Sequence, residues 1–279
     1  MGVVGEKMKK IVIGLVWLLG SIFPACGHSE VNTMMMESTF RIYGSNGKTG
    51  TVFFIGKPDG TGKNKAVMVT AGHVLADMPG DEATIVFRKR GSDGQWTRFE
   101  QSIHIRQMGH PLWKVHPEAD VAGMLLPLPQ GITLSGAGVD WLVSDYVIQQ
   151  YGIHPGMDLS CLGFPFGAEA NAAGFPILRS GKIASYPLIP TAKTKTFLFD
   201  FSVFGGNSGG PVFYEIKNPE LNGSTNIGSS VSGIMGLVIE SYDITEKMSS
   251  TFETSEKRTP LRLAVVVHAS YIRQLVDSL

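Results

Sequence analysis

Glycines surround a single serine in the segment Gly205-Gly-Asn-Ser-Gly-Gly-Pro-Val212. Glycine adopts backbone angles that other residues avoid, so this segment can turn tightly around Ser208. Such a turn can bring the backbone N–H groups of Gly206 and Ser208 to one point, where they would hold the oxyanion of an acyl-transfer intermediate. We therefore expect Ser208 to be a nucleophile and these two N–H groups to form an oxyanion hole.

Two earlier segments supply the partners that a serine nucleophile requires. A serine hydroxyl is protonated at neutral pH and attacks only beside a base that a third group orients. The segment Thr70-Ala-Gly-His73 offers the base, and Ala119-Asp120-Val-Ala122 offers a carboxylate. The sequence predicts a triad of His73, Asp120 and Ser208, with base and carboxylate in one half of the fold and the nucleophile in the other.

Short β-rich runs separated by turn-forming clusters fill most of the chain. There are 34 glycines and 15 prolines, which is typical of many turns between short strands. Clusters such as Gly44-Ser-Asn-Gly47 and Gly91-Ser-Asp-Gly94 supply the positive φ angles that hairpins need. We predict strands in two sets, the first at 39–43, 50–55, 66–69, 84–88, 96–105 and 121–126, and the second at 158–162, 177–185, 196–201, 211–216, 231–239 and 261–267.

The last residues have helical rather than β periodicity. Apolar residues recur at i, i+3, i+4 and i+7 after Ser270, which is a candidate N-cap. They are Ile272, Leu275, Val276 and Leu279. Two polar stretches, 217–230 and 242–259, have no periodicity and are interpreted as long surface loops.

These features resemble the chymotrypsin-fold (trypsin-like) serine proteases, and in particular bacterial members without disulfides. The motifs around His73 and Ser208 carry the resemblance, with further support from Ala119-Asp120-Val-Ala122 and Leu162-Gly-Phe-Pro165. The resemblance implies an all-β fold of two antiparallel six-stranded β-barrels with a C-terminal helix. It also implies an endopeptidase that hydrolyses peptide bonds through an acyl-enzyme, with His73 as general base, Asp120 as its orienter and Ser208 as nucleophile.

The resemblance covers about residues 39–279 and gives a domain organisation. We expect an N-terminal barrel at about 39–137, a connector at about 138–156, a C-terminal barrel at about 157–268 and a C-terminal helix at about 269–279.

The residue before Ser208 departs from the digestive members of this family. Those enzymes have an aspartate that pairs with a newly cut N-terminus, whereas this chain has Asn207. An amide cannot form that ion pair, so activation by the same switch is not expected. Ordering of the turn by a substrate or partner, and constitutive activity, both remain open.

Alignment with the family also predicts a substrate pocket. Ser202 would lie near its base, while Gly236, Leu237 and Val238 would form its wall and the edge that pairs with substrate. A β-branched valine where broad-pocket enzymes have glycine would narrow the opening, and no acidic residue is evident to receive Lys or Arg. We expect cleavage after small or medium aliphatic residues.

The first 27 residues have the pattern of a secretory signal peptide. Lysines precede an apolar run at 11–23, and small residues follow it. This run is shorter than the roughly 20 residues needed to cross a bilayer. We predict an extracytoplasmic protein with a signal peptide at 1–27 and a leader at 28–38. Simple cleavage after Gly27 and lipidation of Cys26, which would provide a membrane anchor, both remain open.

Composition narrows the partners and cofactors. Lys plus Arg equals Asp plus Glu at 24 each, so we expect a protein or peptide substrate rather than nucleic acid, and oligomeric state is not predicted. Cys161 lies in an apolar run and is expected to be buried without a disulfide. No cofactor or metal is expected, because neither helix nor strand periodicity gathers the spaced histidines into a zinc site. These are His104, His110 and His116.

Three alternatives remain. Gly206-Asn-Ser-Gly-Gly210 also satisfies the G-x-S-x-G signature of α/β-hydrolases, with Asp243 and His268 following in that fold's order. That serine must lead into a helix, however, and the residues after Ser208 are β-rich. The other two alternatives keep the protease-like fold: a catalytically silent peptide-binding protein with a distorted oxyanion loop, and an esterase that uses the same serine.

Overall fold

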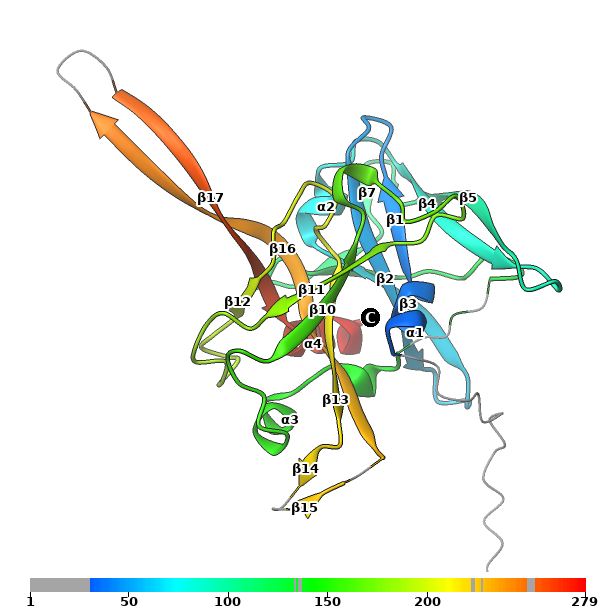
Figure 1. Ribbon diagram of the computed structural model, residues 1–279. Coiled ribbons are helices and arrows are strands. Elements are labelled where there is room, and N and C mark those ends of the chain that lie inside the picture. The colour runs from blue at the N-terminus through cyan, green and yellow to red at the C-terminus, as the bar shows by residue number, and fades with distance from the viewer. Residues whose placement is uncertain (1–30, 133, 135–136, 222–223, 227, 250–253) are drawn as a thin grey trace, which may run out of the picture.

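Strands dominate the protein, as a computed structural model shows (Figure 1). The structure describes residues 31–132, 134, 137–221, 224–226, 228–249 and 254–279. The predicted signal peptide at 1–27, with Cys26, lies outside these residues. Within the described ranges, no helix has both the length and the apolar character needed to cross a membrane.

The N-terminal half forms one antiparallel sheet of seven strands in the order β5-β4-β1-β2-β3-β9-β8. Their bounds are β1 (Thr39–Tyr43), β2 (Thr49–Pro58), β3 (Asn64–Thr70), β4 (Glu82–Arg90), β5 (Trp96–His104), β8 (Lys114–Val115) and β9 (Ala122–Leu125). The sheet has one strand more than predicted, because the short β8 pairs with β9. A separate pair consists of β6 (Arg106–Gln107) and β7 (His110–Pro111).

The C-terminal half forms a six-stranded antiparallel sheet in the order β11-β10-β13-β16-β17-β12. Its strands are β10 (Asp158–Gly163), β11 (Ile177–Lys182), β12 (Thr196–Asp200), β13 (Pro211–Lys217), β16 (Ser230–Ser249) and β17 (Thr254–His268). A bridge between Ile183 and Phe199 joins the two ends of the sheet, which closes it into a barrel. The predicted all-β class is therefore confirmed.

The interpretation of 242–259 as a long surface loop is wrong. In this stretch β16 and β17 continue to pair, from Asp243 opposite Pro260 to Ser249 opposite Thr254, and they extend from the barrel as a long ribbon (Figure 1). The stretch 217–230 also contains two short paired strands, β14 (Glu220–Leu221) and β15 (Ser224–Thr225). Ladder pairing uses backbone groups, so a polar stretch without apolar alternation can still form strands.

Short helices connect or cover the sheets. They are α1 (Val31–Glu37), α2 (Gly72–Ala76), α3 (Asp145–Gln150) and α4 (Ala269–Ser278), with single 3₁₀ turns η1 (Val139–Trp141) and η2 (Pro165–Gly167). The predicted C-terminal helix is confirmed, and Ile272, Leu275 and Val276 of its apolar stripe are buried. Its N-cap is His268 rather than Ser270, because the helix begins two residues earlier than an N-cap at Ser270 predicted. Part of the predicted leader is also helical, since α1 buries Met35 in the core.

Aromatic side chains fill the interior of each half. In the N-terminal sheet, the rings of Phe40 and Phe87 lie 5.1 Å apart and both contact Phe54. Burial of each such ring contributes roughly 1.5–3 kcal/mol to stability. Cys161 lies in the C-terminal core, as predicted, where burial raises the pKa of its thiol to about 12. This thiol is therefore protonated and behaves as a small apolar side chain.

Candidate active site

His73 and Asp120 meet at the end of β3. The chain passes from β3 directly into α2, whose second residue is His73. The ring Nδ1 of His73 lies 2.6 Å from Asp120 Oδ2, and the backbone N–H of His73 donates to Asp120 Oδ1 at 3.0 Å. A Cβ on Gly72 would lie only 2.7 Å from the same Oδ1. A glycine before the histidine thus lets the carboxylate approach both the ring and the backbone.

This contact shifts the pKa of both groups. The hydrogen bond that the His73 ring donates to Asp120 raises the pKa of His73 above its ordinary value, although burial of the ring opposes it. Burial tends to raise the pKa of Asp120, but the hydrogen bonds and charge of His73 outweigh it and the pKa is lowered. Asp120 is therefore ionised at neutral pH and favours the protonated imidazole. Because it occupies Nδ1, the remaining ring nitrogen, Nε2, is the one left to exchange protons with other groups.

The segment around Ser208, which we call the serine turn (residues 205–208), is held through its carbonyl groups. The N–H of Phe166 donates to the Gly205 carbonyl at 2.6 Å. From β2, the Thr51 hydroxyl donates to the Gly206 carbonyl at 2.7 Å and the Thr51 N–H donates to the Ser208 carbonyl at 2.9 Å. Contacts from both halves of the protein thus fix the orientation of consecutive peptide groups.

Glycine is required at the centre of this turn. Gly206 has a φ of +97°, and a Cβ there would lie 2.2 Å from the carbonyl oxygen of Phe164. No other residue would fit without moving the backbone. Within the described part of the chain, the N–H groups of Gly206 and Ser208 donate to no protein acceptor. Both predicted oxyanion-hole donors are therefore uncommitted.

His73 and Ser208 line the same cavity, which has a volume of about 430 Å³. Its walls come from the β1–β2 turn and the α2 region on one side and from the serine turn and Phe166 on the other. The Ser208 hydroxyl donates to the Ile239 carbonyl at 3.2 Å. No hydrogen bond joins Ser208 to His73 among the residues described. The hydroxyl must therefore leave Ile239 before it can reach an imidazole across the cavity.

The structure places the predicted pocket wall within the C-terminal barrel. Gly236, Leu237 and Val238 are buried in the barrel, and Gly236 pairs with β13 on one side and β17 on the other. A β-bulge between Val212 and Phe213 shifts the register of β13 against β16. The narrowing of the substrate pocket by Val238 stays a prediction.

Ile239 is the second residue of β16 beyond its ladder with β13, and its carbonyl accepts a hydrogen bond from the Ser208 hydroxyl. Ser202, predicted at the pocket base, is half-buried, and its carbonyl accepts a hydrogen bond from Arg179 at 2.7 Å. The Arg179 guanidinium also stacks 4.4 Å from the Phe201 ring centroid. The guanidinium of Arg179 thus places a positive charge beside the residue that was predicted to lie at the pocket base.

Two contributors to the site were missed by sequence reasoning. Thr51 and Phe166 hold the serine turn, yet each lies in an unremarkable context: one in the middle of a β-rich run and the other in a Gly/Pro-rich connection. Their roles depend on contacts between segments that are distant in sequence. For Thr51 the two segments lie more than a hundred residues apart. No local pattern could have indicated them.

The arrangement that α/β-hydrolases require is absent around Ser208. The chain continues from the serine turn into β13, not into a helix. His268 is buried at 1% exposure, and burial lowers the pKa of its ring to about 4. The side chain of Asp243 lies outside the described residues. Among those described, the structure contains no group of metal-ligating side chains, including around His104, His110 and His116.

Comparisons with known proteins identify similar folds only. No family model matches the chain, and no curated protein matches it. Among solved structures, a thermostable serine protease, AL20, from an extremophilic microorganism is 14% identical, with coverage of 87% of this chain and 96% of its own and a TM-score of 0.46. The protease Anisep from Arthrobacter nicotinovorans is 16% identical, with coverage of 88% and 96% and the same TM-score of 0.46. Likeness at this level carries no argument about the reactive residues of this chain.

Proposed function

We propose that this protein is a serine endopeptidase that hydrolyses peptide bonds through an acyl-enzyme. The observation that supports it best is the His73–Asp120 contact of 2.6 Å beside a cavity that also contains Ser208. A base oriented by a carboxylate, a serine within the same cavity and two uncommitted N–H donors are the parts that acyl transfer requires.

Each group has a defined role in the proposed reaction. His73 Nε2 takes the proton of the Ser208 hydroxyl as its oxygen attacks the substrate carbonyl carbon, and Asp120 stabilises the imidazolium. The N–H groups of Gly206 and Ser208 receive the oxyanion. His73 then returns the proton to the leaving amine, which leaves an ester on Ser208. A water molecule repeats the sequence and releases the acid.

The catalytically silent alternative is disfavoured by the orientation of the serine turn. A closed oxyanion loop would direct a carbonyl towards the Ser208 N–H. Here the Gly205 and Gly206 carbonyls are held by Phe166 and Thr51 instead. The donors therefore remain open to a substrate oxygen, as an active enzyme requires.

The proposed substrate is an extended polypeptide outside the cytoplasm. Beyond its ladder with β13, β16 reaches Ser208 at Ile239, and a substrate strand can add to such an edge through main-chain hydrogen bonds. An ester lacks this extended backbone, so an endopeptidase gains rate from longer peptides whereas a simple esterase does not. The proposed site of action follows from the signal pattern at 1–27.

A serine-directed fluorophosphonate tests the proposal. Wild-type protein should be labelled and should cleave peptides, with a higher kcat/KM for longer substrates. Ser208→Ala should abolish both labelling and cleavage, and His73→Ala should reduce both by several orders of magnitude because the hydroxyl loses its base.

Ser180→Ala is the matched control, because Ser180 is an exposed serine on β11. It should label and cleave like the wild type. Folded wild-type protein that is neither labelled nor active on peptides would refute the proposal. Equal rates on short esters and long peptides would favour the esterase.

A further inference from the structure

The connection between β10 and β11 packs against the serine turn. This connection, which we call the clamp loop (residues 164–176), supplies the Phe166 N–H that binds the Gly205 carbonyl. The Phe166 ring also lies 5.3 Å from the Phe204 ring. The Phe164 carbonyl packs against Gly206 so closely that no side chain fits between them. Movement of this loop would release the peptide that orients the Gly206 N–H.

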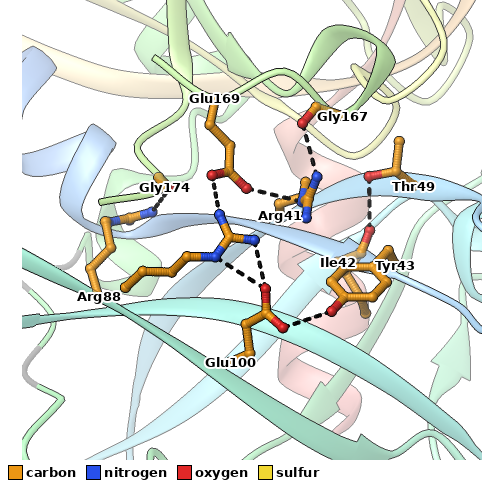
Figure 2. Close-up of polar contacts among 10 residues, drawn as sticks. Arg41, Ile42, Tyr43, Thr49, Arg88, Glu100, Gly167, Glu169 and Gly174 are labelled. Carbon is orange, nitrogen blue, oxygen red and sulfur yellow. Dashed lines mark hydrogen bonds and ion pairs between the residues drawn. The ribbon is translucent and has the colours of Figure 1, made fainter. Parts of the chain in front are cut away.

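Arg41 and Glu169 fix the clamp loop to the N-terminal sheet (Figure 2). From β1, Arg41 donates to the Gly167 carbonyl at 2.9 Å, and its Nε lies 3.2 Å from Glu169 Oε1. The second oxygen of Glu169 pairs with Arg98 of β5. The Glu169 side chain is only 13% exposed, so these charges are weakly screened by solvent. One carboxylate therefore joins the loop to two strands.

The surrounding polar groups hold Arg98 in place. Glu100 accepts hydrogen bonds from Arg98 at 3.0 and 2.6 Å and another from the Tyr43 hydroxyl at 2.9 Å (Figure 2). Two charge-assisted hydrogen bonds from one guanidinium to the same carboxylate oxygen restrict the orientation of the guanidinium. The partner of Glu169 is thus itself positioned.

Arg88 secures the far end of the clamp loop. It is 2% exposed and donates to the carbonyls of Gly174 at 2.7 Å and of Thr39 at 2.7 Å. Its guanidinium lies between the rings of Phe40 and Phe175, at 4.2 and 4.4 Å from their centroids. Burial lowers its pKa to about 9, so the group still carries its charge at neutral pH. Both ends of the loop are therefore attached to the N-terminal sheet through arginines.

Nothing comparable acts at Asn207 itself. This side chain is 1% exposed, and its Oδ1 has no hydrogen-bond partner within the described residues. An amide here provides no ion pair to order the turn. The order must come from neighbouring segments, and the clamp loop is one that touches the turn directly.

We propose that Arg41 and Glu169 are positioning residues for the oxyanion hole: they hold the clamp loop so that the Phe166 N–H keeps the Gly205 peptide in the orientation that exposes the Gly206 N–H. The serine turn is then ordered by the folded protein and needs no cleavage at an N-terminus. This inference rests on the proposed function for its effect on rate.

Two variants test the clamp in the full chain. Arg41→Ala removes both contacts of the guanidinium, and Glu169→Gln removes the charge while keeping the shape. Each should make the Phe166 amide exchange with solvent at least about tenfold faster, as read by NMR, because its hydrogen bond opens more often. Each should lower kcat by about tenfold with KM changed less than about twofold, which is below the roughly 10²–10³ loss for removal of a whole donor.

Conservative and control variants distinguish a loss of oxyanion-hole positioning from a general loss of folding stability. Arg41→Lys keeps the charge and one donor, so it should recover part of both effects. Lys182→Ala removes an exposed ion pair with Asp158, 2.8 Å long, at the opposite end of the β10–β11 hairpin. It should change neither the exchange of the Phe166 amide nor kcat.

Each outcome decides between the possibilities. Folded Arg41→Ala and Glu169→Gln proteins with wild-type exchange at Phe166 would overturn the proposal, and so would faster exchange with unchanged kcat. If the wild type itself shows no Ser208-dependent turnover, the proposed function fails. Phe166 exchange then decides alone whether Arg41 and Glu169 hold the turn.

Discussion

The two walls of the cavity are fixed in different ways. On the His73 wall, one carboxylate binds both the ring and the backbone of the histidine. On the opposite wall, the serine turn is oriented through carbonyl groups that Thr51 and Phe166 hold from separate segments. The orientation of His73 depends on a charged pair between two residues of one half of the fold. The orientation of the serine turn depends instead on how the two halves pack together.

Removing the charge on the His73 wall should have the largest effect. Asp120→Asn keeps the shape but leaves the imidazole in the wrong tautomer for a base, so kcat should fall by about 10⁴. Steady-state kinetics on a peptide substrate would measure it. Asp158→Asn, at an exposed aspartate on β10, is the control and should match the wild type. A loss of less than tenfold in Asp120→Asn would show that the carboxylate does not orient the base.

Loosening the opposite wall should have a smaller effect. Thr51→Val removes the hydroxyl that binds the Gly206 carbonyl but keeps the backbone bond to Ser208, so kcat should fall by about tenfold, below the loss of a complete oxyanion donor. Thr51→Ser retains a hydroxyl and should recover most of the rate. Thr97→Val, on the exposed face of β5, should be neutral. Equal activity of Thr51→Val and the wild type would show that the turn holds itself.

The dependence of kcat/KM on pH should report the pKa of His73 and should not depend on the opposite wall. His73 must be neutral to accept a proton, and its pKa is raised by the hydrogen bond that its ring donates to Asp120. The protonated fraction of His73 decreases as pH rises, so kcat/KM should increase with pH. The midpoint of this increase should lie above the ordinary histidine pKa of about 6.5. The Arg41→Ala variant should keep this midpoint while its kcat is lower. A midpoint below 6.5 in the wild type would contradict the assigned contact.

Sequence reasoning succeeded where the deciding interactions are local. The strand at 39–43 matches β1, and the motifs around His73, Asp120 and Ser208 lie at one cavity or in contact with its residues. Hydrophobic alternation and glycine-rich turns act over a few residues. Hydrophobic alternation and glycine-rich turns can therefore be recognised in the local sequence.

Other features depend on register or on distant partners. A bulge shifts the register of β13 against β16, and one inserted residue cannot be counted from a single strand. The extension of β16 and β17 arises from mutual backbone pairing in a polar stretch. Arg41 and Glu169 are ordinary charged residues until the fold brings them together across 128 positions of sequence, and their ion pair carries no local signature.

The location and His73 dependence of the fluorophosphonate adduct test the central claim most directly. The claim is that Ser208 becomes nucleophilic because His73 and Asp120 lie across the same cavity. Mass spectrometry of the digested, labelled protein should find one adduct, on the peptide that contains Ser208, and its rate of formation should drop by orders of magnitude in His73→Ala. An adduct on another residue, or one that forms at Ser208 equally fast without the imidazole, would contradict the account.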